Sequence, residues 1–263
     1  MKISVLLENT PCANLTNMLV EHGLSLHIET GGMNILFDMG QSEAIIKNAE
    51  RLGIDLSRVD IAILSHGHYD HGGGLSSFLK VNSKAPIYVC KSAFSSFFNA
   101  KGKYIGLDTS LAENERIIYT NGNMKLDDKV SICNVGISDT DRQNGSFSTF
   151  GLTVMRGDKL FDDDFSHEQY LLIEENGKRI LFCGCAHKGI AHIAESFKPD
   201  ILVGGFHLSK AEDPLFLRSI AYRLALLDTR FYTCHCTGAT QFAFMKKHIP
   251  FLEYIRCGET ITL

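Results

Sequence analysis

Three histidines and an aspartate lie within the hexapeptide 66–71 (HGHYDH), directly after the apolar run 59–64. Composition alone produces such a pattern in roughly one chain of this length in a thousand. The apolar run predicts a buried strand, and the three glycines at 72–74 permit a tight turn. Alternate side chains of an extended chain point the same way, so the first two histidines can share one ion, while the turn brings Asp70 and His71 to a neighbouring position. The hexapeptide therefore predicts a metal site with two adjacent positions at the carboxyl end of a strand.

The composition is that of one globular domain with an ordinary hydrophobic core. The chain has 263 residues, of which 44% are apolar and 21% are charged, and this predicts a single domain over residues 1–263. The segment from about 101 to 164 is rich in Gly, Asn, Asp and Ser and has little periodicity. We expect an irregular, decorated region there, and we expect it to hold the substrate specificity.

Charge and cysteine content bear on location and partners. The N-terminal apolar stretch is too short for a secretory signal, and no run of 18 apolar residues occurs, which predicts a cytoplasmic protein without a membrane span. The eight cysteines are then expected to be free thiols or metal ligands, because the cytosol keeps thiols reduced. A formal net charge of −4 gives no electrostatic footprint for DNA or RNA. The expected partner is a small-molecule substrate, and the oligomeric state is left open.

Strand-like and helix-like segments alternate along most of the chain, which is the pattern of an α/β protein. Helices are expected where apolar residues recur at helical spacing, from Ser42 to Gly53 and near 74–79, 190–197, 214–227 and 239–248. Strands are expected at 3–7, 24–28, 35–37, 59–64, 86–90, 116–119, 130–135, 152–155, 170–173, 180–183, 201–203 and 231–233. The tripeptide Ile-Leu-Phe occurs at both 35–37 and 180–182 and hints at two related halves.

Several predicted strands run directly into polar or glycine-rich segments. Asp38 follows the strand at 35–37, and the segments CGCAH (183–187), GGFH (204–207) and CHCTG (234–238) end three later strands. Ligands of open α/β sheets bind beyond the carboxyl ends of the strands. We therefore expect these strand ends to face one crevice together with the hexapeptide.

These features together resemble the metallo-β-lactamase superfamily over nearly the whole chain. The segments SHGHYDH (65–71), GCAHKGI (184–190), GGFHL (204–208) and HCTG (235–238) are, in this order, similar to one subgroup. A named member of that subgroup makes 7,8-dihydropterin-6-methyl-4-(β-D-ribofuranosyl)aminobenzene-5'-phosphate in methanopterin biosynthesis, and many others are unassigned metal-dependent hydrolases. The resemblance implies an α/β (α+β) fold, the four-layer αββα metallo-β-lactamase sandwich, with a dinuclear metal site.

The resemblance also implies ligands for two divalent ions, with zinc as the first expectation and iron or manganese as alternatives. The ligands would form two sets of three: His66, His68 and His187 for the first ion, and Asp70, His71 and His235 for the second. Asp38 would orient the hexapeptide loop by hydrogen bonds, as carboxylates do for ligating histidines. The alternatives are a turn-forming role for Asp38 and a structural, buried role for the histidines at 187 and 235.

One position departs from the superfamily pattern. Many members carry a bridging aspartate at the end of the strand that here ends in the tripeptide 183–185, where no carboxylate is available. Cys185 is either a soft ligand in that place, favouring zinc or iron, or a structural thiol. Cys234 and Cys236 flank His235 and would point away from it on an extended chain, so we assign them to the core.

Asp70 and His207 are the candidate catalytic residues. His207 ends a strand between those that carry the two downstream ligand histidines, so we expect a role in substrate binding or proton transfer, with metal ligation or plain structure as alternatives. Glu168 is expected to form hydrogen bonds near the site. We assign His167 to the surface or to a cap, and the acidic run 158–164 to a solvated loop.

Three functions are compatible with this pattern. Ions held in this way activate water and polarise a substrate oxygen, so the first is a metal-dependent hydrolase that attacks a small anionic or phosphorylated metabolite with metal-activated water. The second, which rests on the subgroup resemblance, is a metal-dependent transferase that couples a pterin diphosphate to an aminobenzene ribofuranosyl phosphate. The third is a non-catalytic iron- or zinc-binding sensor, motivated by the thiols beside the histidines.

Overall fold

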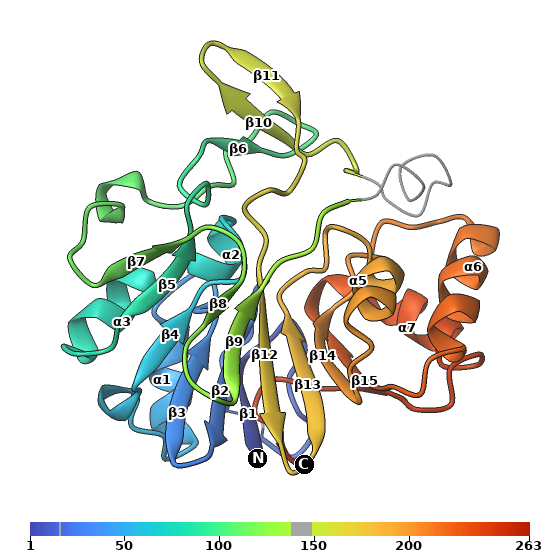
Figure 1. Ribbon diagram of the computed structural model, residues 1–263, viewed down its shortest axis with the longest axis horizontal. Coiled ribbons are helices and arrows are strands. Elements are labelled where there is room, and N and C mark those ends of the chain that lie inside the picture. Colours follow the sequence, from blue (N-terminus) through green and yellow to red (C-terminus); the bar gives the residue numbers. More distant parts are fainter. Residues whose placement is uncertain (16, 138–148) are drawn as a thin grey trace. The chain divides into compact units, whose positions relative to one another are not determined.

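The computed structural model describes residues 1–15, 17–137 and 149–263, which divide into two units. Unit 1 comprises Met1–Asn121, Thr153–Phe161 and Arg256–Leu263, and unit 2 comprises Gly122–Leu152 and Asp162–Ile255. Each unit is built around its own sheet (Figure 1). The expected single domain over 1–263 stays a prediction.

Unit 1 holds a seven-stranded mixed sheet. Its strands are β1 (Lys2–Leu7), β2 (Ser25–Thr30), β3 (Met33–Phe37), β4 (Ile61–Ile63), β5 (Ile87–Cys90), β7 (Ile117–Thr120) and β17 (Thr260–Thr262). They lie in the order β17-β1-β2-β3-β4-β5-β7, in which β17 to β3 pair antiparallel and β3 to β7 pair parallel. A small sheet of order β11-β10-β6 consists of β6 (Phe97–Phe98), β10 (Thr153–Arg156) and β11 (Lys159–Asp162).

The helices of unit 1 cover one face of its large sheet. They are α1 (Ala44–Arg51), α2 (Tyr69–Gly72) and α3 (Leu75–Val81), with short 3₁₀ turns η1 (Leu56–Arg58) and η2 (Thr109–Leu111). Ile45 of α1 and Phe78 of α3 are fully buried in one apolar cluster with Leu36 of β3 and Ile87 of β5. Burial of each such side chain stabilises the fold by about 1.5–3 kcal/mol, which fixes the strands whose ends carry the site.

Unit 2 repeats this plan. Its strands are β8 (Met124–Lys125), β9 (Val130–Cys133), β12 (Tyr170–Glu175), β13 (Lys178–Cys183), β14 (Ile201–Gly205), β15 (Arg230–Cys234) and β16 (Leu252–Tyr254). The order is β16-β15-β14-β13-β12-β9-β8, with β13 to β16 parallel and the remaining pairs antiparallel. Residues of α5 (Ile190–Phe197), α6 (Pro214–Ala225) and α7 (Ala239–Met245) form one buried cluster with this sheet, and η3 (His235–Thr237) follows β15. The three helices are labelled in Figure 1.

The two Ile-Leu-Phe tripeptides occupy the same place in the two sheets. In β3 the tripeptide pairs antiparallel with β2 and parallel with β4, and in β13 it pairs antiparallel with β12 and parallel with β14. All six side chains are at most 2% exposed, so both faces of each strand are covered, which favours an unbroken apolar run. The repeated tripeptide therefore marks the strand that changes from antiparallel to parallel pairing in each unit.

Every strand and helix expected from the sequence is present, with ends that move by a few residues. The short elements α2, β6, β8, β11, β16 and β17 were not expected, because segments of two to four residues carry no readable periodicity. Within the described ranges, no helix has the length and apolar character needed to cross a membrane.

Two assignments in the acidic segment were wrong. Asp163 was expected in a solvated loop and His167 at the surface or in a cap, yet they are only 2% and 1% exposed. The His167 Nε2 atom lies 3.1 Å from an Asp163 carboxylate oxygen. Two polar groups that satisfy each other can be buried together, and the sequence spacing of four residues gave no sign of that pairing.

Cys257 ties the C-terminal segment of unit 1 to its first strand. Its thiol donates to the backbone carbonyls of Leu6 and Leu19, each at 3.4 Å, and burial raises the thiol pKa from 9.0 to about 11. A raised pKa in the folded state stabilises the fold below the unfolded pKa, and this contribution is lost as the pH rises toward 11. A rise of the pKa from 9.0 to about 11 corresponds to about 3 kcal/mol.

We therefore expect the free energy of unfolding to fall by about 3 kcal/mol more in the wild type than in Cys257→Ser as the pH rises through this range. Urea unfolding at a series of alkaline pH values measures the difference. Cys12→Ser, which changes a less buried thiol of the same unit, should keep the wild-type pH dependence. Equal pH dependence in wild type and Cys257→Ser would contradict the assignment.

Candidate metal centre

The hexapeptide forms a buried histidine cluster in unit 1. The chain leaves β4, passes through the loop 64–68 and enters α2, so that three imidazoles come together. The ring centroid of His66 lies 4.7 Å from that of His68 and 4.1 Å from that of His71. The three histidines and Asp70 are all buried. This places side chains that favour zinc or iron side by side at a strand end, where the sequence predicted them.

Asp38 organises this cluster from the end of the neighbouring strand β3. One of its carboxylate oxygens accepts the Ser65 backbone N–H at 2.7 Å, and the other accepts the Ser65 hydroxyl at 2.7 Å. The second oxygen also lies 2.6 Å from Nδ1 of His71. Ser65 links Asp38 to a second histidine, because its hydroxyl also lies 2.8 Å from Nδ1 of His66. A fully buried carboxylate thus orients two of the three imidazoles.

The backbone holds the hexapeptide loop on both sides. A Cβ added at Gly67 would lie 2.1 Å from the carbonyl oxygen of Ala93, so only glycine permits this close approach. The Met39 N–H donates to the His71 carbonyl at 2.6 Å. His22, which the sequence did not connect with the site, places Nε2 3.2 Å from an Asp70 carboxylate oxygen. The loop is therefore a rigid support for its side chains.

In unit 2 the loop 184–189 after β13 presents His187, and Glu168 anchors that loop. The Glu168 carboxylate accepts the backbone N–H groups of His187 at 2.7 Å and Lys188 at 3.1 Å. It also accepts the Tyr170 hydroxyl at 2.7 Å. Burial and the neighbouring Glu168 charge raise the pKa of the Tyr170 phenol well above its usual range, so this donor keeps its proton. Glu168 therefore uses its oxygens to shape the loop.

Two further histidines follow β14 and β15. The ring centroid of His207 lies 4.1 Å from that of His187. The Nε2 atom of His207 is buried and meets no hydrogen-bond partner within the described part of the chain. His235 opens η3 directly after β15. Among the described residues, the ligand atoms of Cys185, His187 and His207 lie within 4.8 Å of one another, and so do those of Cys185, His235 and Cys236.

Cys236 is buried, as expected for a core residue, but the argument from an extended chain was wrong. The chain is not extended after His235, because η3 begins there and His235 itself has φ +50°. This bend brings the Cys236 thiol to Cys185 and His235. Burial opposes ionisation of Cys236, but hydrogen bonds from Cys185 and His207 and the charges of both histidines hold its pKa well below the usual value. Cys234 is fully buried, as expected for a core residue.

Four residues that follow β3, β13, β14 and β15 have left-handed backbone conformations. Asp38 has φ +59°, Ala186 +55°, His207 +52° and His235 +50°. Such conformations are uncommon for residues other than glycine, and where the surrounding structure enforces them they often mark functional sites. Asp38 and His235 directly follow β3 and β15, and Ala186 and His207 lie in the loops that follow β13 and β14.

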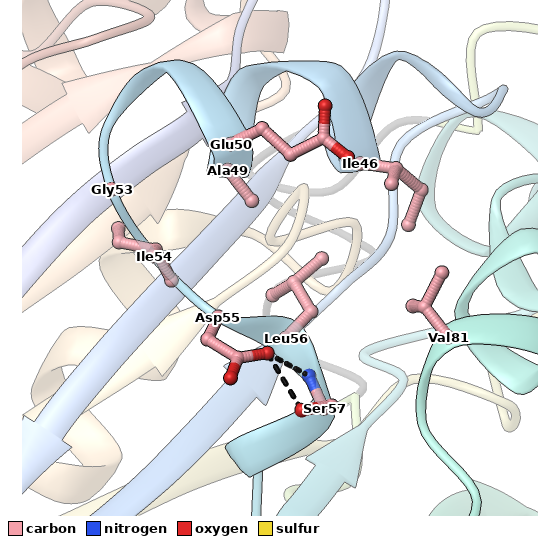
Figure 2. Close-up of a pocket in the computed structure, with 9 residues that line it drawn as sticks. All are labelled: Ile46, Ala49, Glu50, Gly53, Ile54, Asp55, Leu56, Ser57 and Val81. Carbon is pink, nitrogen blue, oxygen red and sulfur yellow. Dashed lines mark hydrogen bonds between the residues drawn. The ribbon is translucent and has the colours of Figure 1, made fainter.

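The structure has a small cavity beside the candidate ligand histidines and a larger groove whose lining contains none of them. A small cavity of about 20 Å³ borders His187 and His207, and its lining includes Phe150, Phe206 and Phe216. A larger open groove of about 380 Å³ lies between α1, the turn at 53–55, η1 and α3 (Figure 2). In this groove the Asp55 carboxylate accepts the N–H and hydroxyl of Ser57, so it serves as a helix cap (Figure 2). The groove has no histidine or cysteine in its lining, and we do not regard it as a catalytic site.

The structure thus builds one ligand cluster in each unit. Residues to which the sequence analysis gave no role in the site also belong to these clusters, namely Ser65, Cys236 and Phe165, whose ring stacks on His187 with centroids 4.4 Å apart. Ser65 directly precedes the hexapeptide, which was the one available signal. Ligand sets that combine residues of the two units stay predictions.

Comparisons with known proteins place the chain in a family. The sequence profile of the metallo-beta-lactamase superfamily matches residues 20–215. A 7,8-dihydropterin-6-methyl-4-(beta-D-ribofuranosyl)-aminobenzene-5'-phosphate synthase of Methanocaldococcus jannaschii is 28% identical over 92% of this chain and 90% of its own length. An uncharacterised protein of the same organism is also 28% identical, over 90% of both chains.

A solved structure leads to the same family. The crystal structure of Tm1679, described as a metal-dependent hydrolase of the β-lactamase superfamily, matches with a TM-score of 0.82 at 27% identity, over 100% of this chain and 99% of that one. Its likeness covers both sheets and their helices, and the profile match spans most of the chain. The α/β sandwich expected from the sequence is therefore present, and the chain belongs to the metallo-β-lactamase superfamily.

Proposed function

We propose that this protein is a metal-dependent hydrolase that acts on a small anionic or phosphorylated metabolite. The observation that carries the proposal is the buried cluster of His66, His68 and His71, whose rings lie 4.1–4.7 Å apart around His66. Three adjacent buried imidazoles oriented by a carboxylate are a donor set suited to zinc or iron. Membership of the superfamily supports this interpretation.

Two divalent ions, zinc first, are the proposed cofactors. The residues proposed to hold them fall into two sets: His66, His68 and His187 for one ion, and Asp70, His71 and His235 for the other. Bound ions of this kind supply Lewis acidity and make water acidic enough to attack near neutral pH. Asp70 and His207 are proposed to transfer protons beside the ions. Asp38 and Glu168 are proposed to position, by hydrogen bonds, the loops that carry the ligands.

The substrate class rests on two observations. The product of the 28% identical relative is, by its printed name, a phosphate ester, which supports a phosphorylated substrate here. The net charge of −4 favours a small molecule over a nucleic acid, because a polyanion requires a basic surface.

A second candidate function is favoured by the same relative, which is named as a synthase rather than a hydrolase. In this case the protein would transfer a pterin group from a pterin diphosphate to an aminobenzene ribofuranosyl phosphate, with diphosphate as the leaving group. Incubation of metal-loaded protein with both compounds, followed by mass spectrometry, tests it. A coupled product supports the transferase, and its absence under conditions that hydrolyse an ester supports the hydrolase.

The hydrolase proposal is tested by metal content and turnover measured together. Elemental analysis should find bound zinc, iron or manganese, and hydrolysis of chromogenic phosphate and carboxylate esters should stop after chelation and resume when metal is restored. His66→Ala should lose both metal and activity, because it removes the central imidazole of the cluster. His248→Ala, which changes an exposed histidine after α7, is the matched control and should keep both.

The outcomes separate the three functions. Activity that survives both chelation and His66→Ala would refute the metal-dependent hydrolase. Metal binding with a redox-dependent spectrum but with no turnover of any ester or pterin substrate would favour the sensor suggested by the thiols.

A further inference from the structure

We propose that the thiolate of Cys185 is a metal ligand shared between the ions held by His187 and His235, and that it makes the centre selective for thiophilic ions. This inference rests on the proposed function, because it requires that those two histidines bind metal. It is argued entirely from residues of unit 2, and it gives Cys185 the position that a bridging carboxylate would otherwise take.

The position of Cys185 is the first argument. Within unit 2, its sulfur belongs to one donor group with nitrogen atoms of His187 and His207 and to another with His235 and Cys236, and the atoms of each group lie within 4.8 Å of one another. One sulfur atom is thus close to both of the histidines that are proposed to bind different ions. Only a residue at such a position can serve as a common ligand.

The distances suit coordination. Around a tetrahedral ion with bonds of about 2.3 Å to sulfur and about 2.0 Å to nitrogen, neighbouring ligand atoms lie about 3.5 Å apart. Separations within 4.8 Å reach that value through small side-chain rotations. Cys185 is only 3% exposed, so its sulfur faces the protein and these donor atoms.

The buried carboxylates among the described residues of this unit, Asp163 and Glu168, are already engaged. The Asp163 carboxylate accepts the Phe165 backbone N–H at 2.8 Å and lies 3.1 Å from Nε2 of His167. Both oxygens of Glu168 accept hydrogen bonds, from the backbone N–H groups of His187 and Lys188 and from the Tyr170 hydroxyl. A carboxylate that accepts hydrogen bonds from three donors serves to fix the conformation of the loop. The anionic ligand at this strand end is therefore the thiolate.

Cys236 has a different task from Cys185. Its sulfur accepts the His207 backbone N–H at 3.2 Å and lies 3.6 Å from the Cys185 carbonyl oxygen. A Cβ added at Gly205 would lie 2.5 Å from this sulfur, so the glycine makes the space that Cys236 fills. Cys236 thus links three strand ends through backbone contacts and positions Cys185 beside the histidines.

The chemistry of sulfur predicts the ion. Thiolates bind zinc and other soft or borderline ions well, whereas magnesium and manganese prefer carboxylate and water oxygens. A shared thiolate therefore makes the centre bind zinc or iron in preference to manganese.

Cobalt substitution tests the ligand directly. Wild-type protein loaded with Co²⁺ should show an intense sulfur-to-cobalt charge-transfer absorption in the near ultraviolet, and Cys185→Ser and Cys185→Asp should lack it. Zinc affinity of Cys185→Ser, measured by competition with a chromophoric chelator, should fall by at least about tenfold, the lower end of the loss seen for supporting residues. Cys183→Ser is the matched control, because that buried thiol two residues away donates to backbone carbonyls, which a hydroxyl can also do.

Each outcome decides one point. A cobalt-loaded wild type without the sulfur band overturns the inference and leaves the hydrolase proposal intact, and this measurement needs no variant. A band that persists in Cys185→Ser but disappears in Cys236→Ser also overturns it. A wild type that binds neither cobalt nor zinc refutes the proposed metal centre itself. Circular dichroism of the metal-free variants identifies any that lose the fold, and for these the wild-type spectrum remains decisive.

Discussion

Replacement of Glu168 by alanine is expected to lower the free energy of unfolding by about 3–5 kcal/mol, because three buried donors lose one acceptor. Those donors are the backbone N–H groups of His187 and Lys188 and the hydroxyl of Tyr170. Glu168 is fully buried, so water cannot take its place without opening the loop. Urea unfolding of the metal-free protein measures the change and keeps it separate from any effect on ion binding.

Two further variants make this test specific. Glu168→Gln keeps one acceptor oxygen but turns the other into a donor, so about half of the loss is expected. Glu174→Ala removes an exposed carboxylate on β12, whose distance to Arg179 is 3.7 Å, and should change stability by less than about 0.5 kcal/mol. If Glu168→Ala were as stable as Glu174→Ala, the anchoring role of Glu168 would be wrong.

Replacement of Asp38 by asparagine is expected to weaken zinc binding by about 10- to 100-fold, as loss of a ligand-orienting carboxylate does elsewhere. The physical reason is the tautomer of His71. A carboxylate 2.6 Å from Nδ1 accepts the proton there and leaves Nε2 free to bind an ion. The amide of asparagine can place an N–H group against Nδ1 instead, which favours the tautomer with its proton on Nε2.

The same substitution also affects the fold. Asp38 is fully buried and holds Ser65 by two hydrogen bonds, so unfolding of the metal-free variant should be easier by about 1–3 kcal/mol. Chelator competition gives the affinity and urea unfolding gives the stability. Asp60→Asn is the control, because its 40% exposed carboxylate accepts the Asn34 N–H, which an amide oxygen can replace. Unchanged zinc affinity in Asp38→Asn would remove Asp38 from the centre.

The strands and helices were readable because their residues follow periodic patterns. The apolar run before the hexapeptide became β4, and the spacing of Ile45 and Ala49 became the buried face of α1. Elements of two to four residues were not predicted, since so few residues show no periodic pattern. The repeated Ile-Leu-Phe tripeptide hinted at two related halves, and the structure gives both copies the same pairing pattern.

The candidate site was readable only in part. Spacing placed His66, His68 and His71 on one loop, because local backbone geometry brings together residues that are close in sequence. The partners of those residues come from other strands. Nothing in the order of residues showed that Glu168 would meet the backbone of His187, or that Asp163 and His167 would be buried as a pair.

By itself, the sequence determined the fold class, the histidine cluster and the strand ends that carry the remaining donors. It also exposed the missing carboxylate at Cys185, but it left open whether that thiol is a ligand or part of the core. Only the tertiary structure shows which residues surround Cys185. The left-handed turn at His235 and the space at Gly205 bring Cys236 against the loop that carries Cys185. The reason is that sequence patterns encode contacts over a few residues, whereas hydrogen bonds between strand ends depend on how the sheet is ordered.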